Sequence, residues 1–379
     1  MHHPLQVLKH YWGYDGFRPG QAEVIDSILS GHDTLALMPT GGGKSITFQV
    51  PALANSGICL VISPLVALMK DQVKNLQKRG ILSAFISSEM PHWEILQQLD
   101  NCVLGDYKFL YISPERISSE LFQEKLKTLS SKVNLLVVDE AHCISQWGND
   151  FRRDYRLIAD IRDAIPHVQV IAVTASATAA VVADICEQLH FRKGYRIFKT
   201  SFERKNLSFV VRKTDNKLKE ICHILSAVPG SAVIYSRTRK GVEEYAGKLR
   251  AAGISAEYFH AGLDPVLKTE RQADWVKGFT RVLVATNAFG MGIDKGDVRV
   301  VIHTEFPDSM EAYYQEAGRA GRDGKRAYAV ALLGPQDITD IKRRPSNAFP
   351  TIEYIKRVYE ALCNRFQIAE GDGEGVSVY

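Results

Sequence analysis

The chain has 379 residues, of which 45% are hydrophobic and 24% charged, and its formal net charge at pH 7 is +4. This composition is ordinary for a globular protein and excludes a disordered or low-complexity chain, while the length exceeds what one hydrophobic core usually supports. The mild basic excess permits a polyanionic partner without demonstrating one. The length therefore predicts two domains, and because no run approaches 18 apolar residues we expect no membrane-spanning segment.

The six cysteines are scattered, and none of their spacings resembles a zinc-ligand pair. We therefore expect no zinc in this chain and a reducing compartment. The N-terminus carries no apolar segment typical of a signal peptide. The expected location is the cytoplasm in association with the nucleoid, or the nucleus if the source is eukaryotic.

Two amphipathic helical patterns occupy residues 5–12 and 21–30, with a turn between them. Gln21 offers the paired donor and acceptor groups that match an adenine edge, and Tyr14 or Arg18 could stack on the ring. A glutamine that opens a helix is by itself more often solvated surface. Its position just before the glycine-rich loop described next favours a role in nucleotide binding.

An apolar strand pattern at 34–38 leads into a glycine-rich loop, which is followed by a helical pattern. Glycine accepts positive φ, so backbone N–H groups can turn toward an anion, and the helix N-terminus adds partial positive charge. Lys44 suits the β- and γ-phosphates, and the Ser45 hydroxyl suits Mg²⁺. An ordinary glycine-rich turn is the alternative, because Met38 stands where the general pattern has glycine. The candidate ATP-binding residues are Thr40, Gly41, Gly42, Gly43, Lys44 and Ser45.

Strand patterns alternate with helical patterns along the rest of the chain. This alternation predicts an α/β protein with two tandem doubly wound parallel sheets, whose ligands lie at the carboxyl ends of the strands. The expected domains are 1–197, 198–340 and 341–379, the last being the start of a truncated accessory domain with an amphipathic helix and a hairpin. The predicted strands are 58–63, 108–113, 135–139 and 168–174 in the first domain, and 232–236, 256–259, 282–285, 300–303 and 327–332 in the second.

The strand at 135–139 ends in two adjacent carboxylates. Asp139 suits the Mg²⁺ shell, and Glu140 suits polarising an attacking water. An acidic surface turn is the alternative. Nearby polar residues at strand ends, namely His142, Thr174 and Ser176, are candidates for coupling the nucleotide site to a second site.

Residues 144–155 interleave aromatic side chains with arginines. Such a segment could stack on unpaired bases and neutralise backbone phosphates, although the spacing of four also fits a helix with an aromatic core stripe. The turns after the predicted strands 58–63 and 108–113 could also hold backbone phosphates. The alternative is that each turn only caps a helix. The candidate nucleic-acid contacts of the first domain are Ser63, Pro64, Arg116, Gln146, Trp147, Phe151, Arg152 and Arg153.

Three residues of the second domain complete the expected catalytic set. Gln315, Arg319 and Arg322 are spaced i, i+4 and i+7, which predicts one shared helix face. Two arginines aimed together suit the charge that develops on a transferred γ-phosphoryl group. A solvated basic face is the alternative, but flanking glycines that allow close approach argue against it.

In this motif order the chain resembles the RecQ family of superfamily 2 DNA helicases, over about residues 5–335. The resemblance implies nucleotide contact by Asp294 and DNA contact by Arg237 and His260. The matching segments are 13–21 (the adenine motif), 38–45 (motif I), 139–142 (motif II), 144–155 (the aromatic-rich loop), 174–176 (motif III), 235–237 (motif IV), 286–295 (motif V) and 315–324 (motif VI). The chain departs from the usual family pattern at Asn149, Arg153 and Ser176.

The resemblance implies two RecA-like domains that hydrolyse ATP with Mg²⁺, move 3′ to 5′ along single-stranded DNA and unwind duplexes in DNA repair and recombination. The implied partners are single-stranded and forked DNA and single-stranded-DNA-binding proteins, with the chain itself a monomer. An RNA-stimulated helicase, a nucleotide-switched clamp without turnover and a P-loop kinase are the alternatives. The aromatic-rich loop favours DNA, the combination of Lys44, Glu140 and Arg319 argues against a clamp, and the second domain argues against a kinase.

Overall fold

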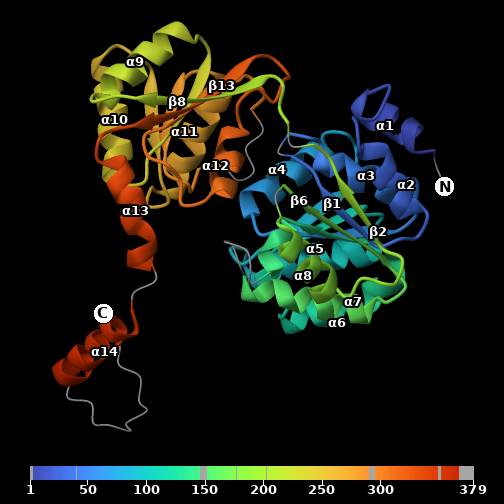
Figure 1. Cartoon of the computed structure of the whole chain (residues 1–379). Coiled ribbons are helices and arrows are strands. Elements are labelled where there is room, and N and C mark those ends of the chain that lie inside the picture. Colours follow the sequence, from blue (N-terminus) through green and yellow to red (C-terminus); the bar gives the residue numbers. More distant parts are fainter. Residues whose placement is uncertain are drawn as a thin grey trace.

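The computed structural model describes residues 3–39, 41–145, 152–175, 177–201, 203–289, 295–348 and 351–366. These residues form two lobes, each built on a parallel β-sheet with helices on both faces (Figure 1). The predicted arrangement of two doubly wound α/β domains is confirmed.

The described residues of the first lobe form a seven-stranded sheet in the order β3-β4-β2-β5-β6-β1-β7. Neighbouring strands pair in parallel throughout. The strands are β1 (Thr34–Leu37), β2 (Ile58–Ile62), β3 (Ser83–Ile86), β4 (Phe109–Ile112), β5 (Val133–Asp139), β6 (Gln169–Thr174) and β7 (Arg196–Lys199).

Side chains alternate across this sheet and build a hydrophobic cluster on each face. Leu35 and Leu37 of β1 point into one cluster, whereas Ala36 and Met38 point into the other. Because helices cover both faces, the central strands are largely apolar, and β2 is apolar at every position. The first cluster includes α5 (His92–Leu104), α6 (Glu120–Leu129), α7 (Ile158–Ala164) and α8 (Ala179–Gln188), and the second includes α1 (Pro4–Trp12), α2 (Gln21–Leu29), α3 (Lys44–Ala54) and α4 (Val66–Gln77).

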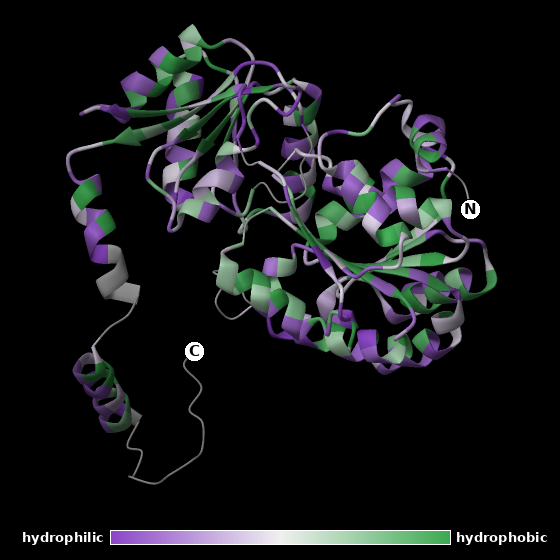
Figure 2. Ribbon diagram, turned by 45° about the vertical axis from the view of Figure 1, so that its right-hand side comes forward, coloured by the Kyte–Doolittle hydropathy of each residue, from purple (hydrophilic) through white to green (hydrophobic). Residues whose placement is uncertain are grey.

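The second lobe has, within the described ranges, a six-stranded parallel sheet in the order β10-β11-β9-β12-β13-β8. Its strands are β8 (Leu207–Lys213), β9 (Ser231–Tyr235), β10 (Ala256–Phe259), β11 (Val282–Ala285), β12 (Val298–His303) and β13 (Ala327–Leu333). One face is covered by α9 (Lys217–Ala227) and α10 (Arg239–Ala251), and the other by α11 (Pro265–Lys277) and α12 (Met310–Ala317). Figure 2 shows the hydrophobic strands enclosed by helices that carry their hydrophilic residues outward.

The two sheets are joined by a short connection. Strand β7 pairs with β1 at the edge of the first sheet and ends at Lys199, and β8 begins the second sheet at Leu207. Residues 200–206 therefore carry the chain from one lobe to the other.

Two helices follow the second sheet, α13 (Asp337–Ala348) and α14 (Ile352–Phe366), and extend away from the lobes (Figure 1). The predicted apolar stripe of α14 is solvent-exposed, with Ile352 and Tyr359 each more than 60% accessible. The predicted hairpin at 366–369 and 376–379 lies outside the described residues. Among the helices of the described ranges, none is long and apolar enough to cross a membrane.

Candidate active site between the two lobes

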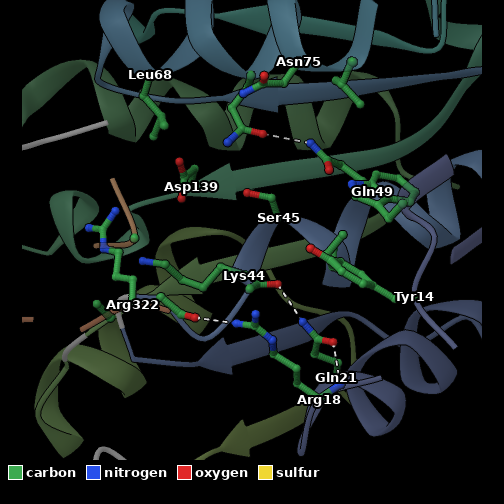
Figure 3. Close-up of a pocket in the computed structure, with 18 of the residues that line it drawn as sticks. Tyr14, Arg18, Gln21, Lys44, Ser45, Gln49, Leu68, Asn75, Asp139 and Arg322 are labelled. Carbon is green, nitrogen blue, oxygen red and sulfur yellow. Dashed lines mark hydrogen bonds between the residues drawn. The ribbon is translucent and has the colours of Figure 1, made fainter. Parts of the chain in front are cut away.

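A cleft of about 990 Å³ opens at the carboxyl ends of the first sheet's strands, and both lobes line it (Figure 3). From the first lobe come the phosphate loop, the turn before α2 and the two carboxylates that follow β5. From the second lobe come Gly296, Gln315, Arg319, Arg322 and Asp323. The fold therefore brings together residues that are more than 270 positions apart in the sequence.

The phosphate loop depends on its glycines. Gly41 and Gly43 have φ of 80° and 79°, in the left-handed region that side chains with a Cβ disfavour. A Cβ at Gly42 would lie 2.9 Å from the Pro39 carbonyl oxygen, so that position has no room for one. Helix α3 begins directly after this loop at Lys44, and both Lys44 and Ser45 line the cleft. Thr40 lies outside the described residues.

Hydrogen bonds connect the phosphate loop to Arg18 in the turn before α2 and to Gln21 at the start of α2. The Gln21 side-chain amide donates to the Gly43 carbonyl at 3.0 Å, and its oxygen accepts from the Arg18 backbone N–H at 2.8 Å. The Arg18 guanidinium donates to the Gly41 carbonyl at 2.8 Å. Gln21, predicted to face adenine, thus has its amide engaged with the loop here and is only 3% exposed. Tyr14 lines the cleft with its ring half exposed.

Of the two carboxylates at the end of β5, Glu140 contacts the phosphate-loop lysine. Lys44 Nζ lies 3.3 Å from Glu140 Oε1, and the Ser63 hydroxyl donates to Asp139 Oδ2 at 3.3 Å. Burial first, and the neighbouring charge of Glu140 second, raise the pKa of Asp139 from 3.8 to about 6, while Lys44 opposes this rise. The surroundings of Asp139 therefore favour its protonated form more than water does.

His142 joins the ends of two neighbouring strands. Its Nδ1 lies 2.8 Å from the Thr174 hydroxyl at the end of β6 and 3.4 Å from Glu140 Oε2. The geometry thus places both described coupling candidates beside the carboxylates. The third candidate, Ser176, lies outside the described residues.

The predicted helical face of Gln315, Arg319 and Arg322 is wrong in one respect. Helix α12 ends at Ala317, so only Gln315 is helical, and both arginines lie in the turns that follow. The chain turns at Gly321, where φ is 62°. All three side chains nevertheless line the cleft. The Arg322 side chain lies against the phosphate loop, since a Cβ at Gly41 would come within 3.3 Å of its Cγ.

Sequence reasoning missed a buried cluster behind these arginines. His303 at the end of β12 stacks on Tyr235 with ring centroids 5.4 Å apart, and its Nε2 lies 2.9 Å from Glu316 Oε2. Burial raises the pKa of Tyr235 to about 12, an effect that Arg319 partly opposes from close by. The cluster fixes the end of α12 next to Arg319. A histidine at the end of an otherwise apolar strand is the signal that could have indicated it.

Several predicted DNA contacts of the first lobe serve its own loops in this structure. Ser63 is 1% exposed and bonded to Asp139, and Pro64 is buried with its carbonyl accepting from Arg152 at 3.3 Å. The Arg116 guanidinium donates to the Ser87 carbonyl at 2.9 Å, which ties two strand exits together. Arg153 is exposed, whereas Gln146, Trp147 and Phe151 lie outside the described residues.

The predicted contacts of the second lobe differ in accessibility. Arg237 is 39% exposed and pairs with Asp308. His260 is 5% exposed, with its Nε2 3.0 Å from Glu243 Oε1. Asp294 lies outside the described residues. The structure thus leaves Arg237 on the surface and buries His260.

Within the described ranges, no three or more His, Cys, Asp or Glu side chains are grouped so that they could hold a metal ion. All six cysteines are free thiols, and Cys59 and Cys102 are deeply buried.

Comparison with known proteins identifies the family. The DEAD/DEAH box helicase model matches residues 18–185, and the helicase conserved C-terminal domain model matches residues 216–324. The ATP-dependent DNA helicase RecQ of Bacillus subtilis is 43% identical over 341 residues, which are 89% of this chain and 57% of that protein. A second protein of that organism, "Probable ATP-dependent DNA helicase RecS", is 39% identical over 337 residues, 88% of this chain and 67% of its own length.

Among solved structures, the Mycobacterium smegmatis helicase Lhr bound to single-stranded DNA and AMP-PNP shares this fold, with a TM-score of 0.71 and 19% identity. The match covers 89% of this chain and 49% of Lhr. The chain spans 54–57% of the length of three curated RecQ helicases that it matches. On these matches and on the site described above, the chain belongs to the RecQ family of superfamily 2 DNA helicases.

Proposed function

We propose that the chain is the motor core of a DNA helicase, which couples Mg-ATP hydrolysis to 3′-to-5′ movement along single-stranded DNA and to duplex unwinding. One observation carries the proposal: Lys44 and Glu140 of the first lobe share a cleft with Arg319 and Arg322 of the second. A site divided in this way changes its geometry whenever the lobes move. Nucleotide turnover can therefore be coupled to displacement.

The residues present fit Mg-ATP. The phosphate loop leaves no room for a Cβ at Gly42, as a close-fitting phosphate cradle requires. The Ser45 hydroxyl and the Asp139 carboxylate are hard oxygen donors of the kind Mg²⁺ prefers, and the raised pKa of Asp139 fits a carboxylate placed for a cation. Bound Mg²⁺ would neutralise negative charge on the β- and γ-phosphates.

The chain's own residues then have separate tasks. Glu140 is placed to orient and deprotonate the attacking water, and its 3.3 Å contact with Lys44 positions it until phosphate takes up part of the lysine's charge. Arg319 and Arg322 are placed to stabilise the charge that develops on the γ-phosphoryl oxygens. The buried Nε of Arg319 has no hydrogen-bond partner among the described residues, so it retains a donor.

The proposed DNA path crosses the carboxyl edges of both sheets, with the exposed Arg153 and Arg237 as phosphate contacts. Residues 146–151 remain the proposed base-stacking segment. We further propose that the motor is a monomer, that its substrates are forked and single-stranded DNA, and that its partners include single-stranded-DNA-binding proteins. Its proposed role is in DNA repair, in the cytoplasm with the nucleoid or in the nucleus.

The test is steady-state ATP hydrolysis with Mg²⁺, first alone, then with single-stranded DNA, then with RNA of matched length. Strong stimulation by DNA alone supports the proposal, and Lys44→Ala serves as the inactive control. Equal stimulation by RNA would favour an RNA-stimulated helicase, and binding without turnover would leave a nucleotide-switched clamp. A forked duplex with a 3′ or a 5′ single-stranded arm then tests polarity, and unwinding restricted to the 5′ arm would contradict the proposed direction.

A further inference from the structure

The connection between the lobes passes directly beside the nucleotide site. Thr200 extends the first sheet by donating its backbone N–H to the Leu37 carbonyl at 3.0 Å. Its side chain lies against the turn before α2, where a Cβ at Gly20 would come within 2.2 Å of Thr200 Cγ2. The connection is therefore anchored to the first lobe before it crosses to the second.

Arg204 in this connection binds the backbone of the turn that carries both catalytic arginines. Its Nη2 donates to the Gly321 carbonyl at 2.7 Å and to the Ala320 carbonyl at 3.0 Å, and its Nη1 donates to the Gly318 carbonyl at 3.4 Å. Burial lowers the pKa of the Arg204 guanidinium without discharging it. One planar fork thus holds three carbonyls of a single turn.

A neighbouring amide strengthens the same contact. Asn206 donates from Nδ2 to the Gly321 carbonyl at 2.7 Å and to the Lys325 carbonyl at 2.8 Å, and its Oδ1 accepts from Arg204 Nε at 3.3 Å. A Cβ at Gly321 would lie 2.6 Å from Asn206 Nδ2. The turn fits closely around these two side chains.

The Arg204 guanidinium also faces the first lobe. Its Nη1 would lie 3.7 Å from a Cβ at Gly41 of the phosphate loop, next to the Arg322 side chain. Arg204 therefore lies between the turn at residues 318–322 and the phosphate loop.

We propose that Arg204 is a positioning residue for ATP hydrolysis, which fixes residues 318–322 so that Arg319 and Arg322 are aimed at the phosphate loop when the lobes close. The inference rests on the proposed function. Arg319 lies between two of the bonded carbonyls, and Arg322 follows the third. Loss of the Arg204 hydrogen bonds would therefore leave the orientation of both side chains unconstrained. Arg204 acts through them and touches no reacting atom.

The experiment compares Arg204→Ala, Arg204→Lys and the matched control Lys205→Ala, which removes the same charge from an exposed neighbour. We expect DNA-stimulated kcat to fall roughly 10²-fold in Arg204→Ala, with KM for ATP changed by less than about twofold, because misplacement of catalytic groups affects the transition state. Arg204→Lys keeps the charge but not the fork, so it should recover only part of kcat. Lys205→Ala should match the wild type.

A mutant cycle separates this role from a general structural one. If Arg204 acts through Arg319 and Arg322, adding Arg204→Ala to the Arg319→Ala/Arg322→Ala variant should reduce kcat by less than about twofold further. Full additivity of the effects on kcat would overturn the proposal. A raised KM for ATP with unchanged kcat in Arg204→Ala would also overturn it, because Arg204 would then be a ground-state ligand of the nucleotide.

Amide hydrogen exchange gives a readout that does not depend on turnover. In Arg204→Ala, residues 318–325 should exchange at least about tenfold faster, while the strands of both sheets keep wild-type protection. Unchanged exchange in residues 318–325 would refute the proposed role of Arg204 in holding this turn, even if the wild-type chain proved inactive. An inactive wild type with faster exchange in the variant would instead refute only the proposed function.

Discussion

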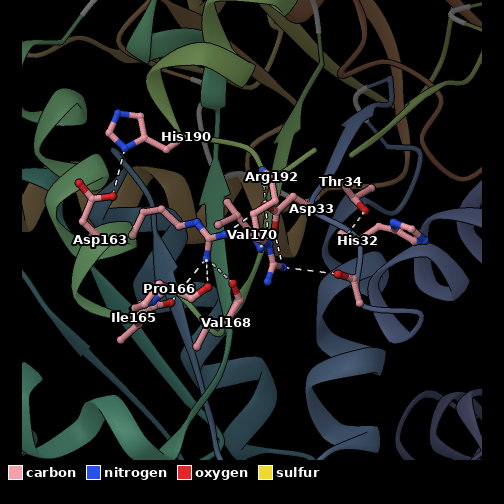
Figure 4. A network of polar contacts seen from close by, with 12 residues as sticks. His32, Asp33, Thr34, Asp163, Ile165, Pro166, Val168, Val170, His190 and Arg192 are labelled. Atoms are coloured by element: carbon pink, nitrogen blue, oxygen red, sulfur yellow. Dashed lines mark hydrogen bonds and ion pairs between the residues drawn. The ribbon is translucent and has the colours of Figure 1, made fainter. Parts of the chain in front are cut away.

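The two ends of the first sheet carry opposite kinds of charge network. At the amino end, the carboxylate of Asp33 is fully buried and faces two guanidinium groups (Figure 4). Arg162 Nη2 lies 3.2 Å from Oδ2, Arg192 Nη2 lies 2.9 Å from Oδ1, and the Val170 backbone N–H donates to Oδ1 at 2.9 Å. This network holds more positive than negative charge, and both carboxylate oxygens are hydrogen-bonded.

At the carboxyl end two carboxylates line an open cleft. Asp139 and Glu140 are adjacent, and the ion pairs found there among the described residues bring one lysine, Lys44, together with the titratable His142. The pKa of Asp139 is accordingly raised to about 6. The difference teaches that a buried carboxylate with both oxygens hydrogen-bonded stabilises the fold, whereas carboxylates that line a cleft keep access to a metal cation and a reacting water.

The largest expected effect is on catalysis at the carboxyl end. Glu140→Gln should lower DNA-stimulated turnover by about 10²–10⁴-fold, the range for loss of a general base, because the amide cannot accept the water's proton. The free energy of unfolding should stay the same or rise, since one of two adjacent like charges is removed. Steady-state hydrolysis and urea unfolding measure the two quantities, with the exposed Glu89→Gln as control. A large loss of stability would contradict the comparison.

The cross-cleft arginines come next. Arg319→Ala and Arg322→Ala should each reduce turnover on the order of 10³-fold, by analogy with arginine fingers. Nucleotide binding by the first lobe should persist, which a fluorescent ADP analogue can measure. Arg326→Ala removes an exposed arginine from the same segment and should have no such effect. Near-normal turnover in both cleft variants would remove these residues from the mechanism.

The amino end should respond in stability instead. Asp33→Asn leaves the buried Arg162 without its carboxylate and should lower the free energy of unfolding by about 3–5 kcal/mol. Turnover per folded molecule should be unchanged, because this network lies at the opposite edge of the sheet from the cleft. Asp163→Asn, which breaks an exposed pair with His190, should cost less than about 1 kcal/mol. Urea unfolding followed by hydrolysis assays compares them.

The smallest effect concerns pH. Because the pKa of Asp139 is higher in the folded chain than its ordinary 3.8, the folded state binds more protons between about pH 4 and 6, and stability falls as pH rises through this window. The contribution is roughly 1–3 kcal/mol. If Asp139 holds Mg²⁺ as proposed, the cation binds the ionised form, so Mg²⁺ should raise the melting temperature of the nucleotide-free chain more at pH 7 than at pH 5. An equal shift at both values, or the same pH trend in Asp139→Asn, would contradict this assignment.

Much of the fold could be predicted from the sequence because its central strands are buried on both faces. Strand β2 is a continuous apolar run and β9 is apolar after Ser231, and the sequence places both within one residue of their observed ends. Strand β8 was not predicted, because it lies at a sheet edge where Phe209 and Val211 are exposed and the pattern is mixed. The phosphate loop was equally readable, since only glycine tolerates its φ angles and close contacts.

The sequence by itself determined which chemical groups the protein possesses and the order in which strands deliver them. Only the tertiary structure decided that α12 ends before Arg319, that the Gln21 amide holds the phosphate loop, and that Arg204 holds a turn 114 to 117 residues away. Asp33, Arg162 and Arg192 likewise meet only in the folded chain. The reason is physical: periodicity and glycine placement reflect local backbone preferences, whereas these contacts arise when packing removes distant polar groups from water and leaves them only one another as partners.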